Sequence, residues 1–61
     1  MEYIRFKVLK DYPSVEGMLH KDDIVLLDKR YKSYVNSSEK IKVQDLMGRL
    51  YIIEGIYLKR I

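Results

Sequence analysis

Apolar residues at every second position constrain the fold of this chain more than any other feature. Within residues 3–10, the apolar side chains of Ile4, Phe6 and Val8 alternate with polar or charged ones. A period of two places the apolar set on one face of an extended segment, so a half-buried β-strand is predicted there. Residues 40–44 alternate in the same way. The pattern therefore favours an all-β fold.

The length of 61 residues limits the chain to one small domain, predicted to span residues 1–61. There is no cysteine, so neither a disulfide nor a thiolate zinc site is available. The longest apolar runs have four residues, whereas a membrane-spanning helix needs about 20, so no contact with a membrane is predicted. Residues 1–5 lack the basic-then-apolar layout of a signal peptide, which predicts a cytoplasmic location.

Three further strands are predicted, at the apolar runs 24–27 and 50–53 and at residues 58–61. A hairpin turn over residues 45–48 precedes the second run, and residues 11–23 are predicted to form a loop folded back onto the body. For residues 28–40 we expect a structured loop or short strand, and the alternative is a helical turn capped by Asp28.

Curling five such strands into a small barrel would bury one face of each of them. The side chains expected inside are Phe6, Val8, Ile24, Leu26, Ile41, Val43, Leu50, Ile52 and Leu58. Tyr51 and Ile53 have the opposite parity to Leu50, so they are expected outside, where they could form a contact between two copies of the chain.

The order of four short motifs resembles that of Src-homology-3 (SH3) domains. Residues 8–12, Val-Leu-Lys-Asp-Tyr, are similar to the Ala-Leu-Tyr-Asp-Tyr segment of that family. Residues 20–24 resemble its entry to the second strand, and the hairpin at 43–51 lies where its distal hairpin would. Residues 53–58, Ile-Glu-Gly-Ile-Tyr-Leu, resemble the closing Ile-Pro-Ser-Asn-Tyr-Val. The resemblance covers nearly the whole chain and implies a five-stranded, partly open SH3-like barrel with a short helical turn before the last strand.

The groove with which SH3 domains bind proline-rich peptides is matched here only in part. Tyr12 and Tyr57 correspond to two of its tyrosines. Lys10 stands in place of a third tyrosine, Glu54 in place of the proline, and the chain has no tryptophan. The resemblance therefore implies the scaffold without the recognition of proline-rich peptides. The first half of the chain also resembles small barrel proteins encoded by phages of Gram-positive bacteria.

The net charge of +3 lies entirely within residues 28–42, which hold five cationic and two acidic side chains. Tyr31 and Tyr34 are interleaved with these cations. Aromatic rings beside cations are typical of surfaces that stack bases and contact phosphates. The other interpretation is a solvated loop whose lysines keep the protein soluble.

Residues that could carry out catalysis or hold a metal are few. His20 is the single histidine, and with Asp22 and Asp23 it offers too few ligands for a metal site. The serines have no positioned base by sequence, and the glycines form no phosphate-binding loop. We therefore expect no enzyme activity, no catalytic residues, no metal and no cofactor.

Non-catalytic binding of another macromolecule is the predicted function. The first hypothesis is a protein-interaction module, such as a phage or mobile-element effector that binds and modulates a host protein. Its expected partner-binding residues are Tyr12, Tyr57, Tyr31, Tyr34, Arg30 and Lys32. The alternative is a small basic DNA- or RNA-binding barrel. Its expected phosphate contacts are Lys29, Arg30, Lys32, Lys40 and Lys42. A third hypothesis is a structural subunit that acts as a homo-oligomer through Tyr51 and Ile53.

Overall fold

The computed structural model describes residues 2–61, which form seven β-strands and two short 3₁₀ helices. The strands are β1 (Tyr3–Val8), β2 (Tyr12–Ser14), β3 (Gly17–Leu19), β4 (Ile24–Asp28), β5 (Lys40–Asp45), β6 (Leu50–Glu54) and β7 (Leu58–Arg60), and the helices are η1 (Lys29–Tyr34) and η2 (Gly55–Tyr57). Within residues 2–61, neither helix has the length or the apolar composition needed to cross a bilayer.

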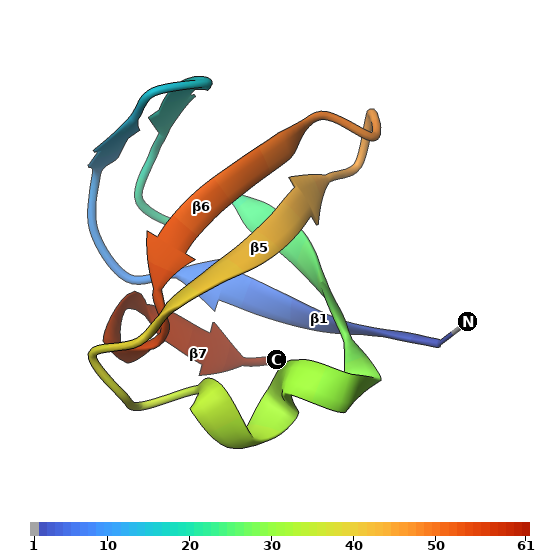
Figure 1. Ribbon diagram of the computed structural model, residues 1–61. Helices are drawn as coiled ribbons and strands as arrows, with labels where there is room; N and C mark the ends of the chain where they lie inside the picture. The colour runs from blue at the N-terminus through green and yellow to red at the C-terminus, as the bar shows by residue number, and fades with distance from the viewer. Residues whose placement is uncertain (1) are drawn as a thin grey trace.

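Five strands form one antiparallel sheet in the order β6-β5-β4-β1-β7, and β2 and β3 form a separate hairpin. Figure 1 shows how the five-stranded sheet curls around on itself, with the β2–β3 hairpin arching beside β6. The helix η2 directly precedes β7. The prediction of an all-β, partly open five-stranded barrel with a short helical turn before the last strand is therefore confirmed.

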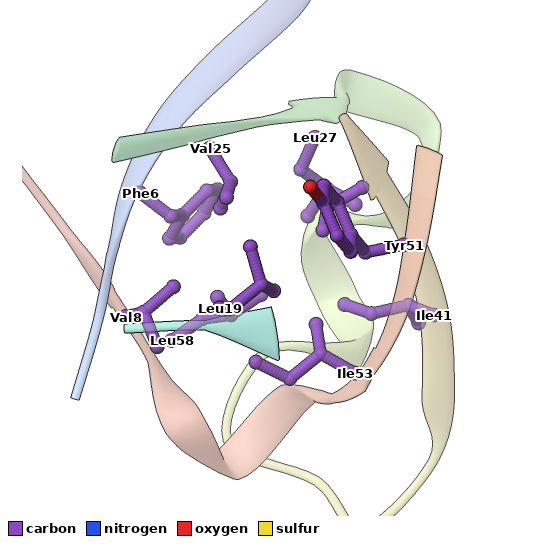
Figure 2. Packing of buried hydrophobic residues seen from close by; sticks show 10 residues of the cluster. Phe6, Val8, Leu19, Val25, Leu27, Ile41, Tyr51, Ile53 and Leu58 are labelled. Carbon is purple, nitrogen blue, oxygen red and sulfur yellow. The ribbon is translucent and has the colours of Figure 1, made fainter. Parts of the chain in front are cut away.

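Apolar side chains from both sheets fill the interior of this half-barrel (Figure 2). The buried set is Phe6, Val8, Leu19, Val25, Leu27, Ile41, Val43, Tyr51, Ile53 and Leu58. Leu19 reaches the core from the β2–β3 hairpin, so this hairpin closes one side of the interior. The expectation that residues 11–23 fold back onto the body is confirmed, although they do so as a hairpin and not as a loop.

The predicted inward faces of β4 and β6 were wrong. Val25 and Leu27 are buried in place of Ile24 and Leu26, and Tyr51 and Ile53 are buried in place of Leu50 and Ile52. The reason is the cross-strand register, since residues directly opposite one another share a face. Phe6 pairs with Val25, Ile41 with Ile53, and Val43 with Tyr51. With Ile53 fully buried and Tyr51 only 6% exposed, these two residues form no surface patch for a second copy.

Within residues 28–40 the helix η1 covers residues 29–34, so the helical alternative holds there, and the expected loop is limited to residues 35–39. The Asp28 side chain accepts a hydrogen bond from the Arg30 backbone N–H, as expected for an N-cap. The segment after η1 is held by η2. The Gly55 N–H donates to the Glu39 carbonyl (3.0 Å), and the Asn36 N–H donates to the Gly55 carbonyl (3.1 Å). These bonds tie the segment that follows η1 to η2.

Candidate binding site

The helix η1 presents an ordered pair of tyrosine rings at the surface. Residues three apart lie above one another in a 3₁₀ helix, which places Tyr31 and Tyr34 on the same side. Their ring centroids are 6.2 Å apart, with planes inclined by 34°. The Arg30 guanidinium lies 5.5 Å from the centre of the Tyr31 ring, so a row of contacts from Arg30 to Tyr34 orders this short helix.

Arg30 is also held by a carboxylate at the start of the helix. Its Nε and Nη2 atoms donate to Asp28 Oδ2 at 3.2 and 3.0 Å, while the Arg30 backbone N–H donates to Asp28 Oδ1 at 3.0 Å. The Asp28 side chain is only 13% exposed, whereas that of Arg30 is 70% exposed. The hydrogen bond from the Arg30 backbone, followed by those from its guanidinium, lowers the pKa of Asp28 below its ordinary value.

A groove of about 530 Å³ lies between η1 and the face of the sheet that points away from the core. Tyr3, Tyr31 and Tyr34 supply its aromatic part, and Leu26 and Leu50 supply its more exposed aliphatic part, beside the buried Ile41 and Val43 of β5. The charged and polar lining consists of Asp28, Arg30, Glu39, Lys40, Lys42 and Gln44. The groove is therefore amphipathic, with rings and aliphatic side chains next to cations.

The five cations expected to contact phosphate are divided between two places. Arg30, Lys40 and Lys42 line the groove, while Lys29 and Lys32 line a second depression that also includes Arg30. Lys29 is 3.8 Å from the Glu2 carboxylate. Within residues 2–61, Lys40 and Lys42 form no ion pair, so their charges are available to a ligand.

Tyr12 and Tyr57 form a second aromatic pair, with ring centroids 5.5 Å apart. The Lys10 ammonium lies 4.4 Å from the centre of the Tyr57 ring, which is a cation–π contact. The Tyr12 hydroxyl donates to Glu54 Oε1 at 3.5 Å. Burial, and then the negative charge of Glu54, raise the pKa of Tyr12 above its ordinary value. Lys10 and Glu54, which depart from the SH3 pattern, are thus the two charged partners of this pair.

The predicted partner-binding residues therefore form two pairs of tyrosines on different elements. Arg30 accompanies Tyr31 and Tyr34, whereas Lys32 does not line their groove. Glu54, the partner of Tyr12, lies opposite the groove residue Lys40 in the register of β5 and β6. Comparison of the chain with protein-family models, with curated proteins and with solved structures finds no match.

Among the groove residues that sequence reasoning did not include in the site are Tyr3, Leu26 and Leu50. Cross-strand pairing brings them there, since Tyr3 lies opposite Asp28, and Gln44 lies between Leu26 and Leu50. A correct register for the hairpin at residues 40–54 would have placed Leu50 outside and so revealed the aliphatic part of the groove.

His20, Asp22 and Asp23 form the turn between β3 and β4. The His20 backbone N–H donates to the Asp23 carboxylate at 2.8 Å, and Asp22 adopts a positive φ of 74°. Among the residues that the structure describes, no three His, Cys, Asp or Glu side chains are grouped so that they could hold a metal ion. These side chains shape a turn.

Replacing Asp28 with asparagine is expected to reduce the dependence of stability on acid pH. Folding lowers the pKa of Asp28, so the charged side chain stabilises the folded protein at pH values above its unfolded-state pKa of about 3.8. This stabilisation is lost as the pH falls through the folded-state pKa. An asparagine side chain would keep an acceptor for the Arg30 N–H but could not lose a charge. Urea unfolding midpoints between about pH 5 and pH 2 should fall less steeply in Asp28→Asn than in the wild type. If the urea midpoints of both proteins fell equally steeply with pH, the charge of Asp28 would not stabilise the start of η1.

Proposed function

We propose that this protein is a non-catalytic protein-interaction module on an SH3-like half-barrel, and that its partner binds in the groove beside η1. The observation that supports this proposal most directly is the clustering of three tyrosine rings and two leucines in one open groove. Tyrosine and arginine are enriched where proteins meet, because each combines a broad apolar surface with polar ends.

Tyr31 and Tyr34 are already held in place before a partner binds, which supports the same proposal. Tyr31 and Tyr34 are 39% and 44% exposed, so both rings retain surface that a partner can cover. Their mutual contact and the contact of Arg30 with Tyr31 restrict the rotamers of all three side chains. A preordered side chain loses less conformational entropy when a partner binds, which favours affinity.

For the biological role we propose an effector that binds and modulates another protein. The resemblance of the first half of the chain to small phage barrels supports a host protein as the target. The Tyr12–Tyr57 pair supplies additional area on which a longer partner could extend.

Binding of DNA or RNA is the second candidate, and one observation favours it. Lys40 and Lys42 line the same groove as Tyr31 and Tyr34, and neither lysine is paired with an acid in the described chain. Phosphates could contact the lysines while a base stacks on a ring. Such binding would weaken steeply with added salt, because counterions compete for the phosphates.

The experiment uses the tagged protein and a tagged Tyr31→Ala/Tyr34→Ala variant to isolate the macromolecules that bind each of them. Each isolation is carried out with and without nuclease. We expect one stoichiometric protein partner that survives nuclease, with its affinity reduced about 10- to 100-fold in the variant. Met47→Ala is the control, because Met47 is an exposed apolar residue on the β5–β6 turn, outside the groove.

Two outcomes would contradict the proposal. Capture that disappears with nuclease would favour the phosphate-contacting barrel. A protein partner that the double variant holds as tightly as the wild type would place the interface elsewhere on the surface.

A further inference from the structure

We infer that the groove beside η1 binds an extended peptide segment that carries an apolar side chain and two carboxylates at alternate positions. This inference rests on the proposed function and specifies the chemistry of the partner. It follows from how charge and apolar surface are distributed along β5.

The cationic half of the groove has the spacing of a β-strand. Lys40 and Lys42 project from the outer face of β5, on either side of the buried Ile41. Alternate residues of a strand are about 7 Å apart on one face. An extended peptide lying along β5 has the same repeat, so carboxylates at positions i and i+2 of the peptide can each contact one lysine.

The apolar half of the groove continues the same row of side chains. Gln44 follows Lys42 on the outer face, and it lies between Leu26 of β4 and Leu50 of β6 in the register. A peptide residue that lies beside Gln44 would therefore contact two leucines. Counted from that residue, the two carboxylates fall two and four positions along the peptide.

The charge of the groove favours such a peptide over a nucleic acid strand. Its lining holds three cations, Arg30, Lys40 and Lys42, against two carboxylates, Asp28 and Glu39, for a net charge of +1. The Arg30 guanidinium is already bound by Asp28. Two free lysines match two carboxylates, whereas a strand of successive phosphates is typically bound by a longer basic surface.

The test is a selection from a random library of displayed linear peptides against the protein of residues 1–61. We expect the enriched peptides to contain two acidic residues at i and i+2, with an apolar residue two positions away. In fluorescence anisotropy, the enriched peptide should bind Lys42→Glu about tenfold more weakly than the wild type.

Lys59→Glu is the matched control, because Lys59 is also an exposed lysine on a strand and makes the same charge change on β7. Its affinity for the enriched peptide should equal that of the wild type. Equal weakening by both variants would reveal a general charge effect and overturn the inference.

The remaining outcomes separate this inference from the proposed function. Enriched peptides without an acidic pair that still require Tyr31 and Tyr34 would overturn the inference and leave a protein-binding groove. Failure to enrich any peptide, together with salt-sensitive binding of an oligothymidylate strand at the groove, would overturn both.

Discussion

Gly55→Ala is expected to unfold a large fraction of the protein at room temperature. A Cβ atom at this position would overlap the carbonyl oxygen of Tyr34, and it would lie 3.2 Å from the Cα atom of Val35. Both are backbone atoms, which cannot rotate away as the end of a side chain can. The expected cost is about 3 kcal/mol or more, at the upper end for added volume in a packed interior. A core in a chain of this size contributes only about 3–5 kcal/mol of net stability.

The close approach at Gly55 exists because three hydrogen bonds draw the segment after η1 onto η2. They join Gly55 N–H to the Glu39 carbonyl, Asn36 N–H to the Gly55 carbonyl, and Ile56 N–H to the Ser37 carbonyl. An added methyl group would separate these two segments. Because the same connection holds Tyr34 and Lys40 in place, the variant should also lose the shape of the groove.

Gly48→Ala separates this steric effect from the general cost of replacing a glycine. Gly48 has a φ of 88° in the β5–β6 turn, and a Cβ atom there would meet no atom within 4 Å. Its replacement should cost about 1–2 kcal/mol, the penalty for an L-residue in that region. Thermal unfolding should therefore show a decrease in Tm of roughly 12 °C or more for Gly55→Ala and a smaller decrease for Gly48→Ala. The reverse order would contradict the tight contact.

The strands could be predicted from the sequence where charged residues alternate with apolar ones, as in β1. There Arg5 and Lys7 show which side faces water, so Phe6 and Val8 were correctly placed inside. The apolar runs of β4 and β6 contain no charged residue to mark the outer face. Their location was predictable and their orientation was not, since only pairing with β1 and β5 decides it.

The candidate site also has a part that could be predicted from the sequence and a part that could not. The Tyr31–Tyr34 pair and the Asp28 cap are local, so spacing along the chain indicates them once the segment is helical. The contact between Tyr12 and Tyr57 joins residues from distant parts of the sequence, and it was suggested only by the order of the SH3-like motifs. The aliphatic part of the groove depended on the orientation of β4 and β6, so it could not be predicted while that orientation was wrong.

Adjacent isoleucines in β6 allow the orientation of that strand to be tested with identical side chains. Ile53 is fully buried beside its partner Ile41, whereas Ile52 is 43% exposed on the outer face opposite Lys42. Ile53→Ala should reduce the free energy of unfolding by about 3–4 kcal/mol, through lost burial and the cavity that remains. Ile52→Ala should reduce it by less than about 1 kcal/mol, because its side chain packs on one side only.

Urea unfolding of both variants measures the difference, provided that the dependence of stability on urea has the same slope in each. A loss from Ile52→Ala that equals or exceeds the loss from Ile53→Ala would mean that Leu50 and Ile52 face the interior. Tyr51 and Ile53 would then lie outside, and the aliphatic part of the groove would be missing. The stability of these two variants therefore tests both the register of the β5–β6 hairpin and the surface on which the proposed partner binds.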